Sequence, residues 1–197
     1  LPSRHQSIKP GSYGETTKLL PIAFNDSMKL AVSVFPTRFT DHLQTILSWG
    51  PLRITLDDKG YVAFYCDDVK FITSKAPIIL AKWNIINIEI SKDQKTVLCI
   101  RDNLTGKEEQ NHQENPKRGI DLDEFENAKI RVATDQSKTE FFNGKIEAPE
   151  IKIDGKTILK YDFSQQIPLF EVPAETGPPL ILRNSPTRAV KGMDWDA

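Results

Sequence analysis

Apolar and polar residues alternate along most of the chain, which is the pattern of β-strands that bury one face. In the stretch SMKLAVSVFP, the residues Met28, Leu30, Val32 and Val34 all fall on the same face. No long stretch follows the 3.6-residue period of an amphipathic helix. Comparable strand patterns recur at 52–56, 60–66, 82–91, 96–102, 128–134, 141–153 and 158–164.

Turn sequences separate these short strands. The sequence DDKG predicts a hairpin, because Gly60 supplies the positive φ that its last position favours. Many short strands with such turns are typical of a sandwich or a barrel. One-sided alternation fits antiparallel sheets with one buried face and one solvated face. We therefore predict an all-β sandwich of two antiparallel sheets.

The stretch FFNGKIEAPEIKIDGKTIL carries two turn signals of its own. Asn143-Gly144 predicts a two-residue type I′ turn, and Asp154-Gly155 predicts a second turn. Pro149 lies between them and indicates a bulge or an edge strand. We expect this stretch to form a half-buried antiparallel element at the margin of a sheet.

The sandwich is predicted to span 19–175, between an N-terminal arm at 1–18 and an extended C-terminal arm at 176–197. The segment 103–127 is polar and lacks periodicity, so we expect a long loop and, from its composition, disorder. The C-terminal segment begins with Gly-Pro-Pro at 177–179 and is expected to be an arm rather than a sheet strand.

Charge and cysteine content limit the classes of protein to which this chain can belong. With 26 basic and 27 acidic residues, no field of one sign attracts nucleic acid or a membrane surface, and we expect neither partner. The chain of 197 residues begins without Met, and we expect a segment of something longer. Cys66 and Cys99 are interpreted as reduced, buried hydrophobes, with a disulfide between neighbouring strands as the alternative. We expect a cytoplasmic location.

The sequence offers little catalytic chemistry. His5, His42 and His112 do not have metal-ligand spacing, and no nucleophile elbow or phosphate-binding loop occurs. Carboxylates adjacent in sequence point to opposite faces of a strand, which suits turns better than a glycosidase pair. We therefore predict no catalytic, metal-binding or cofactor-binding residue in this chain.

Trp49 is the candidate ligand platform. It precedes a Gly-Pro break, where an exposed ring could stack on a sugar. The alternative is a ring that closes one end of the sandwich, which is the commoner use of a buried aromatic.

Three stretches together resemble a known fold. FFNGKIEAPEIKIDGKTIL, TILSWGPLRITLDDKGYVAFYC and APIILAKWNIINIEISKDQKTVLCIRD are similar to successive parts of a laminin-G-like, concanavalin A-like jelly roll, with Trp83 at that fold's Trp position. The resemblance covers Leu19–Phe163 and implies a jelly-roll sandwich.

The flanks resemble a narrower family, the large (beta) subunit of N,N-dimethylformamidase. The motifs are PGSYGE near the start, YDFS at 161–164 and NSPTRAVKGMDW at 184–195, with Tyr161 where the family often has Trp. In that family the arm leads into a separate amidohydrolase domain with an iron centre. The resemblance therefore implies iron in that following domain, and no cofactor, catalytic residue or metal ligand in this segment.

The C-terminal arm carries the candidate interdomain docking residues. Asn184, Pro186, Arg188 and Trp195 match the family motif. Prolines keep such a segment extended, and Arg and Trp are enriched at interface hot spots. The alternative is that the arm folds back on its own sandwich.

These expectations combine into a non-catalytic module of a larger dimethylformamidase-like amidohydrolase. Its partners would be the following catalytic domain or sister subunits. The alternative is a carbohydrate-binding, lectin-like module with a glycan partner. An enzyme acting within this segment is a third possibility, disfavoured by the lack of convergent acid–base groups.

Overall fold

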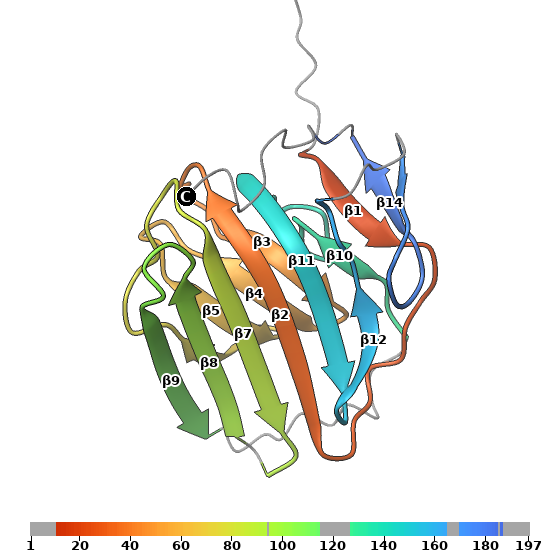
Figure 1. Cartoon of the computed structure of the whole chain (residues 1–197), viewed down its shortest axis with the longest axis horizontal. Helices are drawn as coiled ribbons and strands as arrows, with labels where there is room; N and C mark the ends of the chain where they lie inside the picture. Colours follow the sequence, from red (N-terminus) through yellow and green to blue (C-terminus); the bar gives the residue numbers. More distant parts are fainter. Residues whose placement is uncertain (1–10, 94, 115–126, 165–169, 185, 187–197) are drawn as a thin grey trace, which may run out of the picture.

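The chain folds as two antiparallel β-sheets packed face to face, as the alternation predicts (Figure 1). The structure is a computed structural model and describes residues 11–93, 95–114, 127–164, 170–184 and 186. Within these ranges the regular structure is entirely β-strand. No helix in the described ranges is long and apolar enough to cross a membrane.

The two sheets differ in size. The larger has eight strands in the order β13 (Glu171–Val172), β14 (Leu180–Arg183), β1 (Tyr13–Thr16), β10 (Ile130–Val132), β3 (Gln44–Trp49), β4 (Leu52–Leu56), β5 (Val62–Cys66) and β6 (Val69–Thr73). The smaller has six strands in the order β12 (Lys156–Lys160), β11 (Gly144–Ile153), β2 (Ser27–Pro36), β7 (Asn84–Ser91), β8 (Lys95–Asp102) and β9 (Glu108–Glu114).

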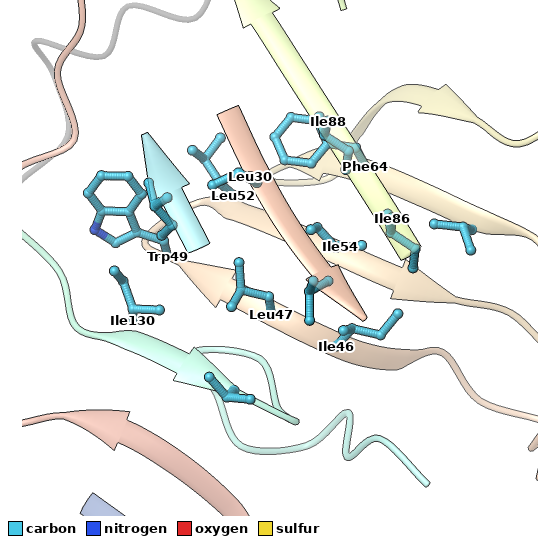
Figure 2. Packing of buried hydrophobic residues seen from close by; sticks show 14 of the residues in the cluster. Leu30, Ile46, Leu47, Trp49, Leu52, Ile54, Phe64, Ile86, Ile88 and Ile130 are labelled. Atoms are coloured by element: carbon cyan, nitrogen blue, oxygen red, sulfur yellow. The ribbon is translucent and has the colours of Figure 1, made fainter. Parts of the chain in front are cut away.

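The core lies between the sheets and is built from the alternating apolar positions. Ile86 and Ile88 on β7 face Ile54 and Phe64 on the larger sheet, and each is at most 1% exposed (Figure 2). Burying one such side chain is worth about 1.5–3 kcal/mol. The stripe of one-sided apolar residues on each strand is therefore what holds the layers together.

Two predicted turns are confirmed. DDKG joins β4 to β5, where the Asp57 carboxylate accepts the N–H groups of Lys59 and Tyr61, and Gly60 has a φ of 89°. Asp154-Gly155 joins β11 to β12 with positive φ at both residues, 50° and 78°.

The Asp154 side chain also ties this second turn to a distant segment. Its carboxylate accepts backbone N–H groups from Asn25, Asp26 and Ser27 at 2.7–3.1 Å. These three residues lead into β2, so one side chain fixes the turn against the start of the neighbouring strand.

Pro149 lies at a β-bulge, as predicted, but not in an edge strand. The register of β11 against β2 shifts between Glu147 and Glu150, and Ala148 has a φ of 47°. β11 is flanked by β2 and β12, so β12 forms the margin of the sheet.

The predicted type I′ turn at Asn143-Gly144 is wrong. The chain crosses here from the larger sheet to the smaller one, and Gly144 pairs with Pro36 on β2. The Gln44 side chain accepts the Asn143 N–H at 2.7 Å, and the Asn143 carbonyl accepts the Thr37 N–H at 3.1 Å. Contacts with distant residues therefore decide the conformation of this dipeptide.

Both arms contribute strands, against the expectation that they lie outside the sheets. β1 lies within 1–18 and β14 within 176–197, and the two pair with each other from Tyr13↔Arg183 to Thr16↔Leu180. Leu180 is 1% exposed, so the start of the C-terminal arm completes the core.

Part of the expected polar loop is also a strand. β9 pairs with β8 along its whole length, and 115–126 lie outside the described residues. Two polar side chains of β9 form hydrogen bonds with the end of β6 and the residues that follow it. Asn111 donates to the Thr73 carbonyl at 2.7 Å, and Glu109 accepts the backbone N–H groups of Lys75 and Ala76.

We predict that Gly144→Ala destabilises the fold. A Cβ at residue 144 would lie 2.3 Å from the Phe35 carbonyl oxygen, and the φ of 158° is one that side chains rarely adopt. Forced overpacking of this kind costs about 1–3 kcal/mol. Gly106→Ala is the control, since φ there is also positive but nothing lies within 4 Å of a Cβ. Equal urea midpoints for the two variants would contradict the prediction.

We predict that Asp154→Ala lowers stability at neutral pH and that the loss shrinks in acid. Hydrogen bonds from the Asp26 and Asn25 amides hold the pKa of Asp154 below its ordinary value of 3.8. The carboxylate therefore stabilises the fold above that value, and the effect disappears as pH falls through the lowered pKa. Urea midpoints between neutral pH and acid measure it, with the exposed Asp58→Ala as control. A pH-independent loss would rule out the carboxylate as its source.

Candidate functional site

The first and last described stretches of the chain meet at one point of the sandwich. The Asn184 side-chain amide donates to the Gly11 carbonyl at 3.0 Å, and the Ser12 hydroxyl donates to the Asn184 carbonyl at 2.8 Å. Asn184 has a φ of 59°, a conformation that Asn tolerates better than most residues. Residues 11–12 and Asn184 therefore lie side by side, at the end of the sandwich to which the β2 and β14 arrows point (Figure 1).

The structure describes two of the four candidate docking residues. Asn184 forms the contacts above, and Pro186 is half-buried. Arg188 and Trp195 lie outside the described residues. The docking role of all four stays a prediction.

A cluster of charges fixes the junction strands from the outside. Glu15 on β1 is 8% exposed, and its carboxylate contacts Arg131 at 3.3 Å, Arg183 at 3.2 Å and Lys129 at 3.8 Å. Burial would raise the pKa of Glu15, but the three neighbouring cations outweigh it and hold that pKa below its ordinary value. One carboxylate thus joins β1, β10 and β14 on the outer face of the sheet.

Hydrogen bonds continue from this cluster across the outer face. Arg131 donates to the Gln136 side chain at 2.7 Å, Gln136 donates to the Ser48 hydroxyl at 2.9 Å, and Ser48 donates to the Thr134 carbonyl at 2.8 Å. The segment 134–140 is thereby held over β3 and β10.

Asp135 organises that covering segment. Its carboxylate accepts the backbone N–H groups of Ser137, Thr139 and Glu140 at 2.7–3.2 Å. Burial would raise the pKa of Asp135, but the hydrogen bonds from Glu140 and Thr139 outweigh it and keep that pKa below its ordinary value.

A second ion pair lies further along the same face. Arg53 donates to both Glu140 oxygens at 2.9 and 3.0 Å, and the Thr45 hydroxyl donates to Glu140 at 2.6 Å. The Arg53 guanidinium also lies 4.8 Å above the Tyr65 ring, with Lys70 at 5.8 Å. Cation–π contacts of this kind stabilise a fixed side-chain arrangement.

These charges act as structural links between strands. In the described part of the chain, no buried side-chain nitrogen or oxygen lacks a hydrogen-bond partner. Nor do three or more His, Cys, Asp or Glu side chains converge there in a way that could hold a metal ion. The carboxylates of Glu15, Asp135 and Glu140 are instead occupied by guanidinium, hydroxyl and amide donors.

Trp49 is not an exposed platform, which corrects one sequence hypothesis. Its ring is 0% exposed, lies in the core beside Leu52 and Ile130 (Figure 2), and donates its indole N–H to the Leu20 carbonyl at 3.2 Å. A ring inside the sandwich cannot stack on a sugar from solvent. The alternative interpretation, a ring that closes one end of the sandwich, agrees with this position.

The histidines and cysteines considered as candidate site residues do not lie together in the described structure. His42 is exposed next to Asp41, His112 is exposed on the edge strand β9, and His5 lies outside the described residues. Cys66 is buried in the core with its pKa raised by burial to about 12, whereas Cys99 is half-buried on β8; both thiols are free.

Comparison with known proteins identifies the fold. No family profile and no curated protein matches the sequence. A carbohydrate-binding protein from Bacteroides ovatus is similar in structure with a TM-score of 0.63 and 14% identity, over 87% of this chain and 56% of that one. The LG1-3 region of the laminin alpha2 chain is similar with a TM-score of 0.57 and 12% identity, over 82% of this chain and 36% of that one.

A tailspike protein of an Escherichia coli O157:H7 bacteriophage is also similar, with a TM-score of 0.51 and 14% identity over 66% of this chain and 20% of that one. This chain therefore spans about a fifth to just over half of the length of these proteins. At such low identity the similarity establishes the fold and not the function. The chain is a laminin-G-like jelly-roll β-sandwich.

Proposed function

We propose that this chain is a non-catalytic β-sandwich module of a larger dimethylformamidase-like amidohydrolase, in which it positions the catalytic domain or a sister subunit. The observation that carries this proposal is the junction at Gly11 and Asn184. Modules attached to larger proteins commonly have chain ends close together at the surface. The motif NSPTRAV starts at Asn184 itself, so it leads directly out of the junction.

The charge cluster around Glu15 supports the same role, because it fixes neighbouring strands to one another. Glu15 links the entering strand β1 to the leaving strand β14 through Arg183, and to β10 through Arg131. Ion pairs around the buried Glu15 carboxylate thus hold β1, β10 and β14 together next to Asn184. The iron and the catalytic residues would belong to the following domain, as the family resemblance implies.

A direct activity assay tests this proposal. We expect the natural full-length protein, loaded with iron, to hydrolyse the C–N bond of N,N-dimethylformamide and release formate and dimethylamine. The 197-residue chain under the same conditions should release neither product. Turnover by the 197-residue chain, or the lack of a hydrolase domain after Ala197 in the natural gene, would refute the proposal.

Carbohydrate binding is the second candidate, favoured by the similarity to the Bacteroides ovatus protein. On the outer face of the larger sheet, Tyr65 is half-buried between Arg53 and Lys70 and offers a partly accessible ring with hydrogen-bond donors around it.

If a glycan binds there, Tyr65→Ala weakens binding at least tenfold, because an aromatic stacking contact is lost. Tyr61→Ala is the control, a half-buried tyrosine in the turn before β5. A glycan array followed by calorimetry with the 197-residue chain measures the effect. No bound glycan, or equal losses in the two variants, excludes this site.

A further inference from the structure

The covering segment 134–140 lies on the outer face of the larger sheet as a loop with joined ends. At its base, the Phe142 N–H donates to the Ala133 carbonyl at 3.0 Å. The residues that flank it, Val132 and Phe142, are 4% and 8% exposed and belong to the core. Compact surface loops whose ends lie close together are Ω-loops, and such loops are frequently functional. The base is therefore fixed to the sandwich independently of the rest of the segment.

Only polar side chains hold the covering segment against the sheet. Its sequence, TDQSKTE, contains no apolar residue. The Gln136 side chain attaches one half of the segment to the Ser48 hydroxyl, and the Glu140 carboxylate attaches the other half to Arg53 and Thr45. A hydrogen bond that breaks at the surface is largely replaced by one to water, so its net contribution is small. The segment can therefore leave the sheet without moving a side chain of the core.

The backbone of the covering segment is compact and strained. The Asp135 carboxylate gathers three of its N–H groups, and the Asp135 carbonyl accepts the Lys138 N–H at 3.2 Å, so the segment moves as one body. Ala133, which precedes the segment, has a φ of 70°, and Lys138 has a φ of 58°. Both conformations are costly for residues with a Cβ and persist only while contacts impose them. Release from the sheet relieves this strain and offsets part of the lost hydrogen bonding.

Opening of the covering segment uncovers polar groups next to Tyr65. Thr45 is 0% exposed and Ser48 is 1% exposed, and the hydroxyls of both bond to the covering segment. Release of Glu140 also frees the Arg53 guanidinium, which lies 4.8 Å above the Tyr65 ring. A few convergent polar groups beside an aromatic ring are what binding sites use to orient a ligand. Two hydroxyls, a guanidinium and a ring on one face suit the hydroxyl-rich ring of a saccharide.

We propose that the covering segment is a lid that opens as one unit and controls the access of a saccharide to this face. In the closed form, Glu140 occupies Arg53, and the segment excludes ligand from the Thr45 and Ser48 hydroxyls. The open form adds these three groups to the Tyr65 platform, so a saccharide binds the open form more tightly and shifts the population towards it. The role in binding rests on the carbohydrate-binding candidate function, whereas the opening itself does not.

Native-state hydrogen exchange of the 197-residue chain, followed by NMR, measures the opening. The Thr45 amide lies on a core strand but donates to the Glu140 carbonyl at 3.1 Å, so it loses its partner when the lid opens. The Phe142 amide at the base keeps its partner. We expect the Thr45 amide to exchange about a hundredfold faster than the amides of Phe142 and β7. Equal exchange of all these amides would overturn the inference, because the segment would then open only when the whole fold unfolds.

A matched pair of variants separates the lid from general stability. Gln136→Ala removes the hydrogen bonds of this side chain with Ser48 and Arg131 but leaves the groups of the binding face in place. It should speed exchange of the Thr45 amide roughly tenfold and leave the Phe142 amide unchanged. Ser137→Ala, at an exposed position of the same segment, should change neither amide. Equal effects of the two variants on Thr45, or a parallel change at Phe142, would overturn the inference.

Calorimetry with the strongest glycan found on the array tests the control of access. Gln136→Ala should bind this glycan several-fold more tightly than the unchanged chain, because a larger fraction of molecules is open, and Ser137→Ala should bind it equally. Equal or weaker binding by Gln136→Ala overturns the inference, while a loss of binding in Tyr65→Ala still supports the carbohydrate-binding candidate function. If no glycan binds the unchanged chain or Gln136→Ala, that candidate function and the control of access both fail, whatever the exchange rates show.

Discussion

The pairing of β1 with β14 is the constraint on which the rest of the structure depends. It joins residues from the two ends of the described chain in one sheet, from Tyr13↔Arg183 to Thr16↔Leu180. The pairing brings Leu180 over the core and places Arg183 beside the Glu15 carboxylate. It also brings Gly11 and Asn184 into contact at one end of the sandwich. Core closure, the charge cluster and this contact thus share one cause.

The features that sequence predicts well are those determined locally. One-sided alternation predicts the sandwich, and the turns at Gly60 and Asp154-Gly155 have the positive φ that their local sequences indicate. Asn143-Gly144 carries an equally strong local signal, yet hydrogen bonds with the distant residues Gln44 and Thr37 decide its geometry. Short strands such as β1 and β14 carry too few residues for a period to be visible.

The ion pairs of the charge cluster could not be predicted from the sequence, for a different reason. Glu15 lies 116 residues from Arg131 and 168 residues from Arg183, so no spacing rule can relate them. Trp49 illustrates the reverse error, since a Gly-Pro break suggests a loop whereas strand pairing with Leu52 and Ile130 places the ring inside. The motif beginning at Asn184 is visible in the sequence because it is contiguous, and its docking role stays a prediction.

The edge strand β9 has a consequence for the solution behaviour of the protein. An open sheet edge invites strands of neighbouring molecules to add to it, which is a route to aggregation. The sequence EEQNHQE contains no apolar residue, so an added strand would have to desolvate glutamates and amides. The polar composition of β9, which makes the strand hard to predict from sequence, therefore also disfavours aggregation through this edge.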